Sequence, residues 1–141
     1  RIKPTKISED VCVPVAALPE FMAAVQELAR RLRLDVVLFG HAGDGNLHPN
    51  ILCDERDSEE MARVQQAVDE LFALALRLGG TLSGEHGTGL LKAPYLPQAV
   101  DPVNLELQQA VKRLLDPKGL LNPGKVFAGC AGTALPGLAS L

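Results

Sequence analysis

Aromatic rings and basic clusters are scarce in this sequence. It has no tryptophan, four phenylalanines and one tyrosine, which argues against a base-stacking platform and against an aromatic-rich interface. The net charge is −3 and no basic cluster is present, so we expect neither nucleic acid nor an anionic membrane surface as a partner. The sequence also lacks an apolar run of about eighteen residues, the length that a membrane-spanning helix needs.

Cysteine is equally scarce. Cys12, Cys53 and Cys130 are widely spaced and form no CxxC pair, which argues against a disulfide framework and a thiolate metal site and favours a reducing compartment. We therefore expect a cytoplasmic protein, with peripheral attachment at the inner face of the membrane as the alternative. There is no initiator methionine, and residues 1–10 are polar and mixed in charge, unlike a signal peptide. We expect a piece excised from a longer chain.

The length of 141 residues predicts one domain, large enough to bury a core without disulfides. Apolar residues at three- and four-residue spacing predict two amphipathic helices, over 19–33 and 58–78. Four strands are predicted: residues 9–13, which stop at Pro14, the β-branched apolar run at 36–39, and residues 46–52 and 81–85.

The order of these elements is β-α-β-β-α-β, which is typical of an α+β, ferredoxin-like antiparallel sheet. In that order the first and third strands are central, the helices cover one face, and the other face is bare and needs a partner or a site. A third helix is predicted over 102–115, with four apolar residues facing inward: Val103, Leu107, Val111 and Leu114. The low-complexity residues 128–141 are expected to form a flexible tail.

All three histidines lie in two glycine-rich stretches. His41 and His48 belong to residues 40–50 (GHAGDGNLHPN), and His86 follows Glu85 in residues 84–89 (GEHGTG). Side chains alternate along a strand, so Asn46, His48 and Asn50 should share the face turned away from the helices. Two histidines and one glutamate form the ligand set of a catalytic divalent metal site with an open position. His86 would then stand beside the metal as a neutral general base.

Structural roles are the competing interpretation. A single histidine at a strand end is usually a hydrogen-bonded structural residue, and it is the concentration of all three beside a carboxylate that favours a shared site. Asp44 is assigned to a turn, since Asp-Gly is a common turn dipeptide. Gly87-Thr88-Gly89 with Lys92 lacks the residue order of a phosphate-binding loop.

Three motifs in this order resemble the C-terminal domain of FAD-linked 2-hydroxy-acid oxidoreductases, a family that includes D-lactate dehydrogenases, the FAD subunit of glycolate oxidase and D-2-hydroxyglutarate dehydrogenase. They are the two histidine stretches and residues 115–126 (LDPKGLLNPGKV). The segment EDVCVP at 9–14 is also similar to the one that leads into the family's first helix. The resemblance covers roughly residues 6–127, so residues 1–127 would be the C-terminal part of the substrate and metal domain.

The resemblance implies a role for several residues. His41, His48 and Glu85 match the family's divalent-metal ligands, usually for zinc, and His86 matches the residue proposed as the base for the substrate hydroxyl. Asn50 matches a substrate contact, and Asn122 lies where the family's chain meets its FAD domain. The family's substrate-binding lysine aligns with Ser8, which leaves Lys6 as the candidate. FAD, a small 2-hydroxy acid and an iron–sulfur or other electron-transfer partner are implied as well; the oligomeric state stays open, with a homodimer as one option.

Two other functions stay open on the residues alone. One is a zinc-dependent hydrolase that uses a water bound by His41, His48 and Glu85; the other is a non-catalytic, ferredoxin-like interaction module whose bare sheet face binds another chain. Hydrolysis of an ester panel that depends on added zinc would favour the first. Full stability in chelator, with no metal by elemental analysis, would favour the second.

The family's FAD-binding domain is absent from these residues, as is the half of the substrate domain that supplies Arg and Thr to the substrate carboxylate. We therefore expect the purified 141-residue chain to show no flavin absorbance and no dye reduction with glycolate or D-lactate. Turnover by the isolated chain would contradict this expectation.

Overall fold

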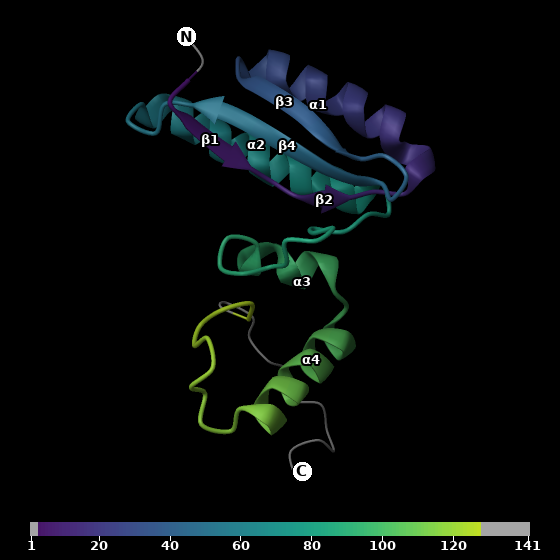
Figure 1. The fold of residues 1–141 in the computed structure, drawn as a ribbon, viewed down its shortest axis with the longest axis vertical. Helices are drawn as coiled ribbons and strands as arrows, with labels where there is room; N and C mark the ends of the chain where they lie inside the picture. Colours follow the sequence, from purple (N-terminus) through teal and green to yellow (C-terminus); the bar gives the residue numbers. More distant parts are fainter. Residues whose placement is uncertain (1–2, 128–141) are drawn as a thin grey trace. The chain divides into compact units, whose positions relative to one another are not determined.

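The computed structural model describes residues 3–127, which divide into two compact units at Gly87 and Thr88 (Figure 1). Each unit is considered by itself. The expected tail at 128–141, with Cys130, lies outside the described residues. No helix in the described part of the chain is long and apolar enough to cross a bilayer.

The first unit is built on a four-stranded antiparallel sheet, which confirms the expected α+β class. The strand predicted at residues 46–52, β4 in the structure, is central. It pairs with β3 along one edge and with β1 and β2 along the other. The strands are β1 (Thr5–Ser8), β2 (Val11–Cys12), β3 (Asp35–His41) and β4 (Asn46–Cys53).

A proline in the central strand explains why the first strand is split into β1 and β2. Ser8 pairs with Asn50 and Val11 with Leu47, so the register continues unchanged across the gap. The Glu9 N–H donates to the Pro49 carbonyl at 2.9 Å, but Pro49 has no N–H to return the bond. The pairing is therefore interrupted beside Pro49, and the first strand begins four residues before its predicted start at Glu9.

Two helices cover one face of this sheet (Figure 1). They are α1 (Leu18–Leu32), after a short 3-10 turn at Val15–Ala17, and α2 (Ser58–Arg77). Both match the predicted helices; the Asp57 carboxylate caps α2 by accepting from the Glu59 and Glu60 N–H groups, each at 3.0 Å. The helices pack on each other and on the strands, and their apolar stripes meet the buried side chains of β4 that face them, Leu47, Ile51 and Cys53.

The fourth predicted strand, 81–85, is wrong. In the structure Thr81 makes an isolated bridge with Cys12, which is the flanking position expected of that strand, but the residues after it form no ladder. The N–H groups of Gly84, Glu85 and His86 donate to the side chain of Asp10 instead. A carboxylate thus takes the donors that a neighbouring strand would have used.

The second unit holds three short helical segments: η2 (Ala93–Tyr95), α3 (Leu96–Ala99) and α4 (Pro102–Leu115). The position of α4 matches the prediction, but its inward face does not. Among the residues that the structure describes, the apolar stripe Val103, Leu107, Val111 and Leu114 is 49 to 74% exposed, while Leu105 and Glu106 are buried. Periodicity identifies side chains that share a face, and it does not say whether another element covers that face.

The turn between β3 and β4 depends on a glycine. Gly45 has φ +73°, and its carbonyl accepts from the Val13 N–H at 2.9 Å. A Cβ atom on Gly45 would lie 2.0 Å from the Val13 carbonyl oxygen, whereas one on Gly43 would meet nothing within 4 Å. The turn between His41 and β4 therefore requires glycine at position 45 and tolerates a side chain at position 43.

We predict that Gly45→Ala destabilises the protein by more than about 1 kcal/mol, because alanine meets both an unfavourable φ and a backbone clash there. Gly43→Ala is the matched control and should leave stability within about 0.5 kcal/mol. Urea unfolding followed by circular dichroism measures both. Equal midpoints for the two variants would contradict the turn geometry.

Candidate functional site

The polar face of the sheet, opposite the helices, holds the predicted site residues of the first unit. Residues paired across antiparallel strands project to the same face, and the register pairs His41 with Asn46 and Phe39 with His48. The predicted alternation along β4 is thus confirmed. The rings of His41 and His48 meet edge-on with centroids 5.6 Å apart, and the Phe39 ring lies 5.7 Å from that of His48.

Glu85 brings the second glycine-rich stretch to these two histidines. Its Oε1 atom lies 3.1 Å from Nε2 of His48 and 3.7 Å from Nε2 of His41. The side chain of His48 is buried, whereas those of His41 and Glu85 are about half exposed. One carboxylate oxygen and two imidazole nitrogens therefore converge at a point that solvent and small molecules can reach.

This donor set fits a divalent metal ion. The ligand atoms of His41, His48 and Glu85 all lie within 4.8 Å of one another, and nitrogen and carboxylate oxygen are the donors that zinc and related ions take in proteins. Two histidines and one carboxylate leave coordination positions open. The arrangement could therefore bind an ion and still admit a small oxygen ligand.

A second group, Asp10, His48 and His86, meets the same distance criterion. It is the weaker candidate because Asp10 is fully buried and its Oδ2 atom already accepts four hydrogen bonds. Removing a carboxylate from such a set of donors would leave several polar groups unpaired. In the first group the carboxylate is that of Glu85, which is half exposed, so its use as a ligand carries no such cost.

His86 stands beside the donor set. Its ring stacks on that of His48 with centroids 5.3 Å apart and an angle of 14° between the planes. Its Nε2 atom lies 3.9 Å from Glu85 Oε1, and about half of the side chain is exposed. Stacking fixes the plane of the ring while an edge stays accessible, which suits a group that takes a proton from a bound molecule.

The two predicted substrate residues lie further along the same face. Asn50 is 1% exposed and donates from Nδ2 to the His48 carbonyl at 2.7 Å; its buried Oδ1 has no hydrogen-bond partner within the described residues. Lys6 is exposed on β1 and pairs with Leu52, two positions from Asn50 on β4. The structure thus brings His41, His48, Glu85 and His86 together, and places Asn50 and Lys6 on their face of the sheet, with Asn50 bonded to the His48 backbone.

Asn122, the predicted cofactor residue, belongs to the second unit. It has φ +45°, and its carbonyl accepts from the Lys125 N–H at 3.2 Å. Before it, the Asp116 carboxylate accepts from the Leu120 and Leu121 N–H groups, each at 2.9 Å, and Lys112 holds the pKa of that carboxyl below its usual value. Asn122 lines a cavity of about 310 Å³ together with Lys125, Phe127 and the neighbouring glycines.

Asp10 is the residue that the sequence interpretation missed. The continuous register across β1 and β2 places it opposite His48, and its Oδ2 atom binds the loop that carries Glu85 and His86. The sequence does hold one signal for it. Asp10 precedes the apolar residues 11–13 and shares the strand face of Cys12, so its carboxylate is turned away from the helices. What it binds there depends on a loop more than seventy positions away.

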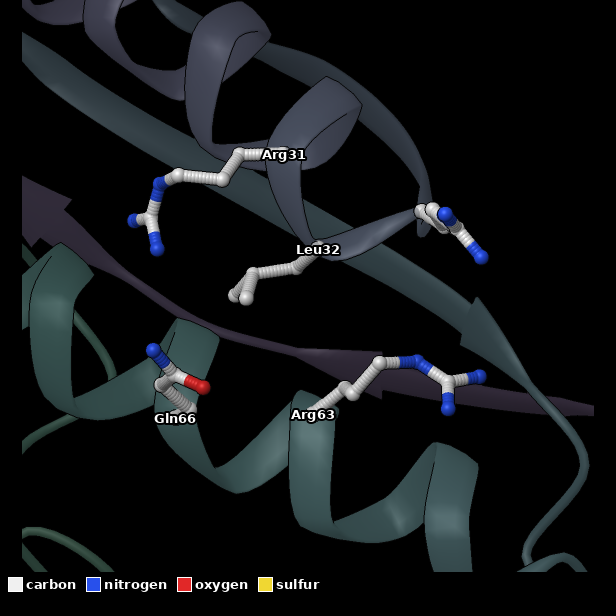
Figure 2. Close-up of a pocket in the computed structure, with 5 residues that line it drawn as sticks. Arg31, Leu32, Arg63 and Gln66 are labelled. Atoms are coloured by element: carbon white, nitrogen blue, oxygen red, sulfur yellow. The ribbon is translucent and has the colours of Figure 1, made fainter.

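A hollow of the first unit lies away from the histidine site. A cavity of about 420 Å³ lies between α1 and α2 (Figure 2), lined by Arg31, Leu32, Arg33, Arg63 and Gln66. Arg31 is paired with Glu70 of α2. None of the residues that line this cavity belongs to the histidine site, because the cavity lies on the helical side of the sheet.

The sequence of this chain matches a protein family and several known proteins. The family described as FAD linked oxidases, C-terminal domain, matches residues 1–126. The glycolate oxidase subunit GlcD of Bacillus subtilis is 45% identical over 91% of this chain and 27% of its own length. A D-2-hydroxyglutarate dehydrogenase of Xanthomonas citri is 42% identical over 87% of the chain and 27% of its own length. A D-lactate dehydrogenase of Archaeoglobus fulgidus is 40% identical over 83% of the chain and 26% of its own length. The chain therefore spans about a quarter of the length of these relatives.

Proposed function

The chain belongs to the family of FAD linked oxidases, C-terminal domain, and from this premise we propose that it supplies the metal site and the catalytic base of an FAD-dependent oxidoreductase that converts a D-2-hydroxy acid to the 2-oxo acid. The substrate is glycolate, D-lactate or a similar acid, in line with the names of the relatives. The observation that carries the proposal is the convergence of His41, His48 and Glu85 with His86 beside them.

The metal ligands are His41, His48 and Glu85, and zinc suits this set of nitrogen and oxygen donors. A bound divalent ion would hold the 2-hydroxyl and carboxylate oxygens of the substrate and lower the pKa of the hydroxyl. His41 and Glu85 stand at the open side of the site, since both are about half exposed. His48 supports them from the sheet, where burial and the neighbouring Phe39 ring restrict its orientation.

His86 is the catalytic base. It takes the proton of the substrate 2-hydroxyl at its imidazole. A bound FAD would supply the acceptor for the hydride at C2. The stacking on His48 keeps the His86 ring beside the ligands. Asn50 contacts the substrate from β4, and Lys6 is the proposed partner of its carboxylate.

FAD would be bound mainly by a separate domain of the whole protein, with Asn122 near the junction to it. Turnover would need an acceptor for the two electrons removed from the substrate, so an iron–sulfur protein or another electron carrier is the proposed partner. A cytoplasmic location and a homodimer are compatible with this role and belong to the same proposal.

A zinc-dependent hydrolase is less well supported. Such an enzyme needs a carboxylate or another base beside the metal-bound water in addition to the ligands. The carboxylates grouped with the histidines in the described residues are Glu85, used as a ligand, and Asp10, which is buried and hydrogen-bonded. His86 could serve as that base, so both functions would use the same four side chains, and it is the family match that favours the oxidoreductase.

The metal site makes a first prediction. Metal-stripped protein should bind one divalent ion per chain, and His41→Ala and Glu85→Gln should each weaken zinc binding by at least about 100-fold, because each removes a ligand. Asp44→Asn is the matched control, an acidic residue in the same glycine-rich stretch that is assigned to the turn. Competition with a chelating dye measures the affinities. Unchanged affinity in both ligand variants would contradict the proposed site.

The base makes a second prediction. In the whole flavoprotein, His86→Gln should slow flavin reduction by the hydroxy acid by about 100- to 10,000-fold, because proton removal from the hydroxyl contributes on that order. Anaerobic stopped-flow absorbance of the flavin measures the rate. The metal content should equal that of the unsubstituted protein, which separates loss of the base from loss of the ion. A normal rate of flavin reduction would exclude His86 as the base.

A further inference from the structure

Asp10 is a charged side chain in the interior of the first unit. It follows Glu9 in the gap between β1 and β2, and none of its surface is exposed. Burying a carboxylate in this way is costly unless hydrogen bonds replace the water that it loses. The contacts that replace this water therefore indicate what the residue holds in place.

One oxygen of Asp10 accepts hydrogen bonds from three consecutive backbone amides. Oδ2 lies 3.0 Å from the nitrogens of Gly84 and Glu85 and 2.9 Å from that of His86. It also accepts from the Ser83 hydroxyl at 2.6 Å, and the Ser83 oxygen in turn accepts from the Gly87 N–H at 2.7 Å. Successive N–H groups around one anion form a nest, and such a nest fixes the backbone that forms it.

The backbone held in this way carries a proposed ligand and the proposed base. Residues 84–86 are exposed and belong to no strand or helix, so regular secondary structure does not hold them. Gly84 is packed tightly as well, because a Cβ there would lie 2.4 Å from the side chain of Asn46. The hydrogen bonds to Asp10 and the close packing against Asn46 therefore hold the loop on the histidine face of the sheet.

The other oxygen of Asp10 faces His48. Oδ1 lies 3.8 Å from Nδ1 of His48, on the side of the ring opposite the nitrogen that approaches Glu85. This Nδ1 is buried and has no hydrogen-bond partner within the described residues. A carboxylate on that side favours the tautomer with its proton on Nδ1, which leaves the Nε2 lone pair for a metal ion.

We propose that Asp10 is a positioning residue for this site: its carboxylate ties the Glu85–His86 loop to the central strand and orients His48, so that the three ligands and the base keep their relative positions. The inference rests on the proposed function, since it describes how that same site is held together. Asp10 acts through its neighbours and touches neither metal nor substrate. The competing role is direct ligation through the group of Asp10, His48 and His86.

Asp10→Asn tests this role. The amide keeps the size of the side chain but carries no negative charge, and an N–H₂ group directed at His48 would favour the wrong tautomer, as the same change does in a Ser-His-Asp triad. We expect zinc affinity to fall about 10- to 100-fold, the range seen when groups behind metal ligands are removed. The absorption spectrum of the cobalt-substituted protein should change shape, and kcat for the hydroxy acid should fall in the whole flavoprotein.

Glu9→Gln is the matched control. Glu9 is also buried and acidic. It precedes Asp10 in the gap between β1 and β2, and because side chains alternate along the continuous register, it lies on the helical face. It should leave zinc affinity and the cobalt spectrum unchanged even if it lowers the unfolding temperature. Ser83→Ala is the second variant, for the case in which Asp10→Asn does not fold; it removes one donor to Oδ2 and should weaken zinc binding in the same direction, to a smaller extent.

The outcomes separate the two proposals. If His41→Ala and Glu85→Gln weaken zinc binding while Asp10→Asn and Ser83→Ala both behave like Glu9→Gln, the positioning role is wrong and the metal site stands. If Asp10→Asn abolishes binding as completely as His48→Ala, Asp10 is a ligand and the positioning role is overturned. If the two ligand variants bind zinc normally, the proposed function itself fails.

Discussion

A single buried carboxylate organises the described site. Asp10 lies opposite His48, and its Oδ2 atom collects the N–H groups of Gly84, Glu85 and His86. A chain segment that could have completed the sheet as a fourth strand therefore remains a loop. That loop places Glu85 Oε1 3.1 Å from Nε2 of His48 and 3.7 Å from Nε2 of His41, and stacks the His86 ring on that of His48. The hydrogen bonds of the Asp10 carboxylate thus account both for the loop conformation of residues 84–86 and for the position of Glu85 and His86 beside the histidines.

The break in the first strand and the position of Asp10 have a related cause. Proline is normally confined to edge strands because it cannot donate to the ladder, yet Pro49 lies in the central strand β4. The pairing lapses at Glu9 and Asp10, next to His48. The interruption frees no side chain by itself, but it coincides with the residue whose carboxylate binds the loop at residues 84–86. The proposed metal ligand His48 is therefore the immediate neighbour of Pro49, at which the strand pairing is interrupted.

The spacing of apolar and polar residues correctly predicted the elements that depend on residues close in sequence. The apolar spacing around Phe21 and Leu71 identified the two helices, and alternation along β4 placed His48 and Asn50 on one face. The strand at 81–85 failed because its donors bind Asp10, a contact between residues more than seventy positions apart. The inward face of α4 failed because spacing does not say what covers a stripe. Convergence of the two histidine stretches was expected, but the contact that produces it could not be inferred from either stretch.

If Asp10 holds residues 84–86 through their amides, these amides are protected from exchange with solvent, which site-resolved hydrogen exchange by NMR measures. These residues are exposed and outside regular structure, so without the carboxylate their amides would exchange like those of an unstructured peptide. With the carboxylate in place, we expect the amides of Gly84, Glu85 and His86 all to exchange at least on the order of 100-fold more slowly than that reference. Exchange of all three at the unstructured rate, in protein whose β4 amides are protected, would contradict it.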